Sequence, residues 1–344
     1  MNNILRVKGL SVSFDVEGGK LYALRGVDLS LNEGETLALV GESGSGKSVT
    51  GKAILGILPK NARITHGRVY YRERELISGG ERVMSELRGR EIAMVPQDPN
   101  LSLDPIMRIG EQITEGIRAP EGLTGKNARE YKKVRAIELL GEVGIPDPVS
   151  RYREYPHRLS GGMRQRVAIA AALASSARLL ICDEPTTALD VTIEAQILDL
   201  LLRVKRDHGL SMIFITHDLG VVARIADKVA VMYAGEIVEY GSVEDIFYDP
   251  KHPYTWALLS SVATEGQERL YRIKGQVPDM REPPLADAFA PRSEYAMEID
   301  YMMSPPTFEV GDGHFVKSWL YHKSAPRVEM PEELRRRIER MRNE

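Results

Sequence analysis

Short apolar runs recur along the chain, and each ends at a glycine or a polar side chain. Runs of about four to eight apolar residues bounded by turn residues are typical of buried strands. The spans that follow this pattern are Thr36–Val40, Ile92–Val95, Ala177–Cys182 and Met212–Thr216. We expect them to form buried strands of an α/β core, in which ligands bind beyond the carboxyl ends of the strands.

Residues 104–158 follow a helical pattern instead. Apolar side chains recur there at intervals of three or four, which places them on one face of a helix. They form two sets, Ile106, Ile109, Ile113 and Ile117, and then Ala136, Leu139, Leu140 and Val143. This stretch predicts a helical insertion in the core.

Antiparallel strands are expected at both ends of the core. The first forty residues suit strands around a Gly18-Gly19 turn, and residues 228–240 alternate around Ala234-Gly235, as in a hairpin. The last segment, 331–344, suits a helix with a narrow apolar stripe at Leu334, Ile338 and Met341. Its many charges favour a solvated helix over one that binds a partner, so we assign it no function.

One turn between a strand and a helix carries recognisable chemistry. Residues 41–48 read Gly-Glu-Ser-Gly-Ser-Gly-Lys-Ser and lead into a helical pattern through Val49, Ala53, Ile54 and Ile57. Its glycines let backbone N–H groups converge on an anion, and the helix start adds partial positive charge. In such a loop the lysine reaches the β- and γ-phosphates and the next hydroxyl binds Mg²⁺. A glycine-rich turn that binds nothing is the alternative. The expected nucleotide-binding residues are Gly41, Ser43, Gly44, Ser45, Gly46, Lys47, Ser48 and Val49.

Two carboxylates follow the apolar run that ends at Cys182. Successive side chains of a strand point to opposite sides, so Asp183 and Glu184 suit different tasks. Asp183 is expected to serve the hydrated Mg²⁺, and Glu184 to polarise the attacking water as general base. Taken alone, the pair also fits solvated acids at a strand end.

Three further polar residues follow predicted strands or precede a predicted helix. Gln97 can offer its carbonyl oxygen to Mg²⁺ or to the attacking water, and His217 can donate to the γ-phosphate. Asp190 precedes a helical stripe at Ile193, Ile197, Leu201 and Val204, so it also suits a helix N-cap.

Over roughly residues 4–250, these motifs resemble the nucleotide-binding subunits of ABC transporters. The resemblance implies a P-loop NTPase fold with an antiparallel β layer. It also implies a helical subdomain, at about residues 98–165, that receives the coupling helices of transmembrane subunits. By resemblance Phe14 stacks on adenine. The other matches are the Walker A loop at Gly41–Ser48, the Q-loop at Gln97, Walker B ending at Asp183-Glu184, the D-loop at Asp190 and the switch histidine at His217.

Residues 159–163, Leu-Ser-Gly-Gly-Met, match the family's signature. Ser160, Gly161 and Gly162 begin a helical pattern, and a helix N-terminus can grip a phosphate. In the family, the signature grips ATP bound to the Walker A loop of another subunit. The resemblance therefore implies a dimer in which Ser160, Gly161, Gly162 and Met163 contact the partner's ATP. Ser160 also suits a simple helix cap.

The chain beyond about residue 250 resembles the C-terminal extension of oligopeptide and dipeptide importer ATPases. The matching stretches are 249–259, 275–278 and 310–314. We therefore expect an ATPase domain at 1–250 and an extension at 251–344. The cargo stays open, because relatives of this branch carry peptides, oligosaccharides or nickel, and the ATPase subunit does not touch the cargo.

Many relatives hold an iron-sulfur cluster on four cysteines in this extension. The matching positions here are Asp287, Ser293, Asp300 and Ser318. Hydroxyls and carboxylates are poor substitutes for thiolates toward such clusters, so we expect none. Packing must then hold the extension, through aromatic residues such as Phe289, Tyr295, Phe308 and Trp319.

Composition fits a protein that acts at a membrane through partners. No apolar run approaches the roughly eighteen residues that span a bilayer, and residues 1–10 lack a signal peptide's apolar core. The net charge of −3 argues against a nucleic-acid partner. The single cysteine, Cys182, lies in an apolar run, which excludes disulfides within the chain and fits the cytoplasmic face of the membrane.

The resemblance implies ATP and Mg²⁺, a second ABC ATPase subunit, two permease subunits and an extracytoplasmic solute-binding protein. A heterodimer is favoured over a homodimer. One alternative is a soluble ABC ATPase acting in DNA repair or on ribosomes, but coiled coils, a zinc module and tandem cassettes are missing from the sequence. Another is a subunit that binds ATP without hydrolysing it, against which Glu184, Gln97 and His217 argue.

Overall fold

The structure, a computed structural model, describes residues 3–187, 189–262 and 273–343. The chain divides into two compact units, each of which combines separate stretches of sequence. Unit 1 contains Met1–Ile4, Asn32–Glu35 and Gly79–Phe214, and unit 2 contains Leu5–Leu31, Thr36–Ser78 and Ile215–Glu344. The domain boundary expected at residue 250 stays a prediction.

Unit 1 contains strands from three of the expected apolar runs. The strands β6 (Ile92–Val95), β7 (Leu179–Asp183) and β8 (Ser211–Ile215) are neighbours in the order β8-β7-β6. β6 and β7 are parallel, with Ile92 opposite Leu179 and Val95 opposite Cys182. Because every residue of β7 and β8 is buried, uninterrupted apolar runs suit them.

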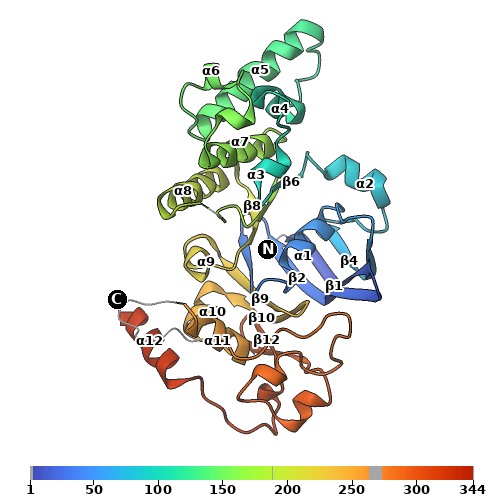
Figure 1. The fold of residues 1–344 in the computed structure, drawn as a ribbon, viewed down its shortest axis with the longest axis vertical. Coiled ribbons are helices and arrows are strands. Elements are labelled where there is room, and N and C mark those ends of the chain that lie inside the picture. The colour runs from blue at the N-terminus through green and yellow to red at the C-terminus, as the bar shows by residue number, and fades with distance from the viewer. Residues whose placement is uncertain (1–2, 188, 263–272, 344) are drawn as a thin grey trace. The chain divides into compact units, whose positions relative to one another are not determined.

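The expected helical insertion is present in unit 1 (Figure 1). Its elements are α3 (Pro99–Ser102), α4 (Ile109–Gly116), α5 (Gly125–Glu142), α6 (Pro148–Arg151), η1 (Pro156–Arg158) and α7 (Gly161–Leu173). All four residues of the second predicted set are buried. The first set is only partly right, because Ile106 precedes α4 and is 85% exposed. Unit 1 also contains α2 (Gly80–Leu87) and α8 (Val191–His208).

Unit 2 contains the fourth expected run as β3 (Thr36–Val40), which pairs in parallel with β9 (Lys228–Tyr233). The predicted hairpin is confirmed, since β9 and β10 (Glu236–Ser242) are antiparallel and left-handed Ala234 and Gly235 form the turn. α1 (Lys47–Ile54) follows β3. The helix was predicted to reach Ile57, which instead lies beyond its end and is 41% exposed. The unit also contains α9 (Leu219–Ile225) and α10 (Val243–Tyr248).

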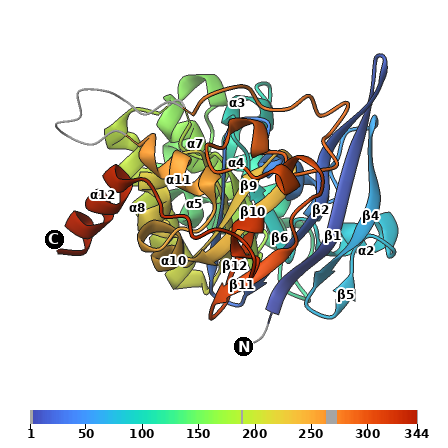
Figure 2. The ribbon, with the colours of Figure 1, turned by 90° about the horizontal axis from the view of Figure 1, so that it is seen from below.

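The expected antiparallel β layer is a separate four-stranded sheet in the order β2-β1-β4-β5. Its strands are β1 (Asn3–Val16), β2 (Gly19–Asn32), β4 (Ala62–Tyr71) and β5 (Arg74–Glu75). β1 and β2 run side by side as long strands joined at residues 17–18 (Figure 2). β1 pairs antiparallel with β4, which places Phe14 opposite Ala62.

The C-terminal extension packs into unit 2. Its strands β11 (Thr307–Gly311) and β12 (His314–Lys317) extend the sheet of β9, because β12 pairs with β10. Helix α12 (Glu332–Asn343) buries Leu334 and Ile338 in a core cluster with residues of α10 and α11 (Pro253–Ser260). The expectation of a solvated helix is therefore wrong for this face of α12. The short helices are η2 (Ala290–Arg292), η3 (Glu298–Tyr301) and η4 (Trp319–Tyr321).

Candidate functional site

The phosphate loop joins β3 to α1 in unit 2. Gly41, Gly44 and Gly46 have φ values of 148°, 80° and 107°, a region that glycine reaches without strain. A Cβ atom on Gly41 would lie 2.1 Å from the carbonyl oxygen of Met232 in β9. Ser45 is buried at the base of the loop, whereas Ser43 and Gly44 form an exposed tip. The loop therefore presents backbone at its tip while its base is tightly packed.

The side chain of Lys47 lies inside this loop and is 5% exposed. Its Nζ donates to the carbonyl oxygens of Gly41 at 2.8 Å and Glu42 at 3.0 Å, and lies 3.5 Å from Ser45 Oγ. A buried ammonium needs such acceptors. The lysine thus stabilises the loop and is close to the expected phosphate position. Of the remaining predicted residues, Ser48, Val49 and Phe14 are half-buried.

Glu42 has partners that the sequence did not indicate. Its carboxylate accepts two hydrogen bonds from Arg292, and its backbone N–H donates to the hydroxyl of Tyr254 at 2.8 Å. Both partners belong to the C-terminal extension. The extension therefore contacts the phosphate loop directly.

The carboxylates expected at the end of β7 are there. Asp183 is the last residue of the strand and is 3% exposed, and Glu184 follows with a positive φ of 44°. Glu184 Oε2 accepts from Gln97 Nε2 at 3.0 Å and from Thr187 Oγ1 at 2.9 Å. Unit 1 thus brings the side chains of Gln97 and Glu184 together. Thr187 was not predicted as a site residue, although its position three residues after Glu184 was a local signal.

The signature leads into α7 in unit 1; Ser160 is exposed, Gly162 and Met163 are half-buried, and Leu159 is buried. Ser160 Oγ accepts from the backbone N–H of Met163 at 3.3 Å, so the expected cap is confirmed. Gly161 is exposed, and a Cβ atom on Gly162 would lie 2.8 Å from Ile193 Cγ2 in α8. Asp190 caps α8 as expected, because its Oδ1 accepts from the backbone N–H of Ile193 at 3.0 Å. Close packing of α7 on α8 therefore links the signature to the D-loop region.

His217 follows β8 and is exposed in unit 2. The polypeptide around it is fixed by its neighbours. Thr216 Oγ1 accepts from the backbone N–H of Asp218 at 3.0 Å, and Asp218 caps α9 by accepting from Gly220 at 2.7 Å. The turn that carries His217 is thus tied to the start of a helix, which restricts the positions available to the imidazole.

The four positions expected to match cluster cysteines of relatives make local hydrogen bonds. Each side chain accepts a backbone N–H two or three residues away. The pairs are Asp287 with Phe289 at 2.9 Å, Ser293 with Tyr295 at 3.2 Å, Asp300 with Met297 at 2.7 Å and Ser318 with Leu320 at 3.3 Å. Burial raises the pKa of the Asp287 carboxyl to about 6 and also raises that of Asp300. Among the described residues, no group of three or more His, Cys, Asp or Glu side chains suits a metal.

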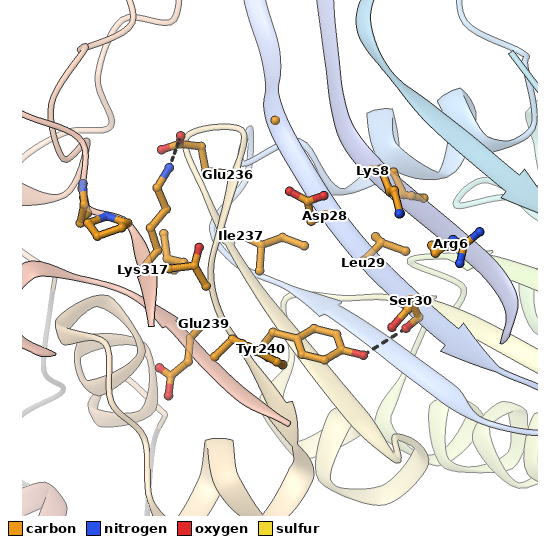
Figure 3. Close-up of a pocket in the computed structure, with 17 residues that line it drawn as sticks. Arg6, Lys8, Asp28, Leu29, Ser30, Glu236, Ile237, Glu239, Tyr240 and Lys317 are labelled. Atoms are coloured by element: carbon orange, nitrogen blue, oxygen red, sulfur yellow. Dashed lines mark hydrogen bonds and ion pairs between the residues drawn. The ribbon is translucent and has the colours of Figure 1, made fainter. Parts of the chain in front are cut away.

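A cavity of about 630 Å³ lies in unit 2 between side chains of β1, β2, β10 and β12 (Figure 3). Two of its polar side chains make hydrogen bonds that cross from one strand to another. Lys317 Nζ donates to Glu236 Oε1 at 2.5 Å, and the Tyr240 hydroxyl donates to the carbonyl oxygen of Ser30 at 3.1 Å. None of the predicted nucleotide residues lines this cavity, so it is separate from the candidate site.

Comparison with known proteins gives two family matches. The model described as "ABC transporter" matches residues 24–187, and "Oligopeptide/dipeptide transporter, C-terminal region" matches residues 238–299. In the part of the chain that the structure describes, no helix has both the length and the apolar character needed to cross a bilayer.

Curated relatives match along nearly the whole chain. The chain is 52% identical to the oligopeptide transport ATP-binding protein OppD of Bacillus subtilis, across 100% of this chain and 96% of that protein. It is 54% identical to AmiE, an oligopeptide transport ATP-binding protein of Streptococcus pneumoniae, across 96% and 93%. Among solved structures, it resembles a dimeric ATP-binding cassette in a post-hydrolysis state with ADP and phosphate. That match has a TM-score of 0.61 and 27% identity, over 70% of this chain and 98% of that one.

Proposed function

The chain belongs to the ABC transporter family, and on that premise we propose that it is the ATP-hydrolysing subunit of an importer for oligopeptides or dipeptides. One observation supports the assignment to importers of oligopeptides or dipeptides within the family. The same chain joins a complete phosphate loop to a C-terminal region of the oligopeptide and dipeptide transporter type. Members of the family bind ATP together with Mg²⁺.

In this proposal the phosphate loop and α1 bind the triphosphate. The exposed tip at Ser43 and Gly44 supplies backbone N–H groups, and the start of α1 adds the positive end of its dipole. Lys47 exchanges the carbonyl oxygens of its own loop for β- and γ-phosphate oxygens. Phe14 stacks on adenine, a role that its half-buried position in β1 permits.

Two residues of unit 1, Glu184 and Gln97, take part in the hydrolysis of ATP. Glu184 is the general base, and its bonds to Gln97 and Thr187 support this role because they fix the direction of the carboxylate. Oxygen ligands suit Mg²⁺, and Ser48, Asp183 and Gln97 would hold it, where it neutralises charge on the phosphates. His217 donates a hydrogen bond to the γ-phosphate.

A partner subunit completes the clasp around each nucleotide. The hydroxyl of Ser160 and the backbone of Gly161, Gly162 and Met163 grip the γ-phosphate bound to the partner, while Asp190 forms the D-loop contact. The exposed signature at the start of α7 supports this assignment. We favour a heterodimer of two ABC ATPase subunits. Two permeases and an extracytoplasmic solute-binding protein complete the importer, with this chain on the cytoplasmic face of the membrane.

The decisive test of the catalytic assignment is Glu184→Gln. Loss of the base should lower the ATPase rate of the assembled transporter by about a hundredfold or more, whereas the affinity for MgATP should stay within about threefold. Phosphate release and equilibrium nucleotide binding measure the two effects separately. Glu194→Gln, in the first turn of α8, serves as the control and should keep the wild-type rate.

A normal rate in Glu184→Gln would remove Glu184 from its role. The branch assignment has its own test, which is peptide uptake into vesicles that contain the permeases and the binding protein. Uptake of oligosaccharide or Ni²⁺ with no uptake of peptide would replace the proposed cargo while leaving the ATPase assignment intact.

A further inference from the structure

Arg292 connects the C-terminal extension to the phosphate loop. Its Nη1 donates to Glu42 Oε2 at 2.6 Å, and its Nη2 donates to Oε1 at 3.0 Å. The side chain of Arg292 is 4% exposed and that of Glu42 is 28% exposed. Bidentate arginine–carboxylate pairs are strong and directional, and burial shields this one from solvent screening.

The guanidinium is held from several sides. Nη1 also donates to the hydroxyl of Tyr233 at 3.2 Å, and Nε donates to the carbonyl oxygen of Lys274 at 2.8 Å. The guanidinium carbon of Arg292, Cζ, lies 5.6 Å from the ring centre of Tyr233 and 5.9 Å from that of Phe289. Tyr233, Tyr254 and Phe289 also contact one another, with ring centres 4.7 to 5.3 Å apart. These contacts together fix the position and the orientation of the Arg292 side chain.

Glu42 poses an electrostatic problem for a loop that binds phosphates. It follows Gly41, and its backbone carbonyl oxygen accepts from Lys47 Nζ, the group assigned to the phosphates. An unpaired carboxylate on this loop would repel a triphosphate bound there, and the repulsion is strong in a partly buried site. The ion pair with Arg292 neutralises this charge.

Resting on the function proposed above, we propose that Arg292 is a positioning residue for ATP, which neutralises and orients Glu42 so that the affinity of the phosphate loop depends on the C-terminal extension. Arg292 does not touch the nucleotide in this scheme. Tyr254 also positions Glu42, because its hydroxyl oxygen accepts a hydrogen bond from the backbone N–H of Glu42 at 2.8 Å. The extension thereby has a task in the ATPase cycle that needs no metal cluster.

The test is a double-mutant cycle in the full chain, in which the charges of Arg292 and Glu42 are removed singly and together. Arg292→Gln leaves Glu42 charged and unpaired, so the dissociation constant for MgATP should rise about tenfold. Glu42→Gln should change it by less than about threefold, and adding Glu42→Gln to Arg292→Gln should restore the constant to within about threefold of wild type. Equilibrium titration with MgATP measures binding, and KM and kcat of the assembled transporter should show the change mainly in KM.

Matched controls separate this role from a structural one. Arg281 makes a similar pair with Asp279 elsewhere in the extension, where both side chains are exposed. Arg281→Gln should leave the dissociation constant unchanged. Arg292→Lys keeps the positive charge without the fork and should weaken binding by less than Arg292→Gln. It also tests neutralisation if the glutamine variant fails to fold.

Two results would overturn the inference. One is a folded Arg292→Gln chain with wild-type affinity for MgATP, and the other is a double variant that binds no better than Arg292→Gln alone. If Arg292→Gln does not fold, the inference is supported when Arg292→Lys weakens binding by less than about fivefold and adding Glu42→Gln restores it, and any other result refutes it. Failure of the wild-type chain itself to bind MgATP would instead refute the proposed function.

Discussion

At Gly41 the phosphate loop and β9 approach so closely that no side chain fits between them. A Cβ atom would lie 2.1 Å from the carbonyl oxygen of Met232, and φ is 148°. Gly41→Ala must therefore shift the loop, and we expect MgATP affinity to fall by about tenfold or more, with a loss of about 1–3 kcal/mol in stability. Nucleotide titration and urea unfolding measure the two effects.

Gly209 provides the comparison. It also has a positive φ, 62°, but a Cβ atom would meet nothing within 4 Å. Gly209→Ala should cost about 1 kcal/mol of stability through backbone strain while leaving MgATP affinity unchanged. Equal effects of the two variants on affinity would mean that close approach to β9 is unimportant for the loop.

Asp287 makes the stability of the extension depend on pH. Burial raises its pKa to about 6, above the unfolded value of about 3.9. The stabilisation from this group is therefore complete below about pH 4 and is lost as the pH rises through about 6. Asp287→Asn keeps an oxygen for the Phe289 N–H and stays uncharged. It should be more stable than wild type at pH 7.5 by on the order of 2 kcal/mol, in urea unfolding.

The difference between Asp287→Asn and wild type should shrink toward zero at pH 4.5. Measurements at both pH values therefore check the sign as well as the size of the effect. A variant that is less stable than wild type at pH 7.5 would show that the ionised carboxylate is favourable in the folded chain.

Contacts between residues close in sequence were predicted better than contacts between residues far apart in sequence. The Ser160 and Asp190 caps depend on residues three positions away, and both are confirmed. The pair between Arg292 and Glu42 joins residues 250 positions apart, so no local pattern marks it. Long-range pairs of this kind appear only once the chain is folded.

Among the elements, α12 offers a direct test of how the extension is held. Leu334 is 3% exposed in a core cluster with residues of α10 and α11, so Leu334→Ala should lower the free energy of unfolding by about 2–4 kcal/mol. Arg340→Ala, on the exposed face, should change it by less than about 0.5 kcal/mol. Urea unfolding of the full chain makes the comparison. Equal stability of the two variants would mean that α12 behaves as the solvated helix expected from its charge pattern.

Apolar periodicity predicted the strands better than the ends of the helices. β3 and β6 have the expected bounds, because a buried strand is a continuous apolar run. The helix after the phosphate loop ends early since Gly56 adopts φ of 62°, which stops α1 before Ile57. Ile106 sits in a turn in which its backbone N–H donates to Asp104 Oδ1 at 2.9 Å. This hydrogen bond stabilises a turn at Ile106, although the spacing of the apolar residues predicted a helix there.

For the whole molecule, the central prediction is a nucleotide held by two subunits. The Glu184→Gln chain should form an ATP-bound dimer, either with itself or with its partner ATPase subunit. The dimer persists because ATP hydrolysis, which separates the two subunits, is blocked. Adding Ser160→Arg places a long side chain at the exposed start of α7 and should abolish this dimer while leaving MgATP binding by the single chain within about threefold. Light scattering with and without ATP measures the assembly. A dimer that persists in the double variant would exclude Ser160 from the interface.

At this scale the sequence predicted family and branch, because ordered motifs mark them and the relatives match nearly the full length. It left the choice between peptide, oligosaccharide and nickel open. In the importer proposed above, the solute-binding protein and the permeases contact the cargo, so the sequence of the ATPase subunit does not encode that choice.

The 250-residue separation between Glu42 and Arg292 has a consequence for biosynthesis. At ribosomal speeds the phosphate loop emerges roughly 10–50 seconds before the arginine that neutralises its carboxylate. A nascent or prematurely terminated polypeptide would therefore carry a complete glycine-rich loop with weakened hold on nucleotide. Full affinity for MgATP would therefore follow only after the segment that contains Arg292 has been synthesised and folded.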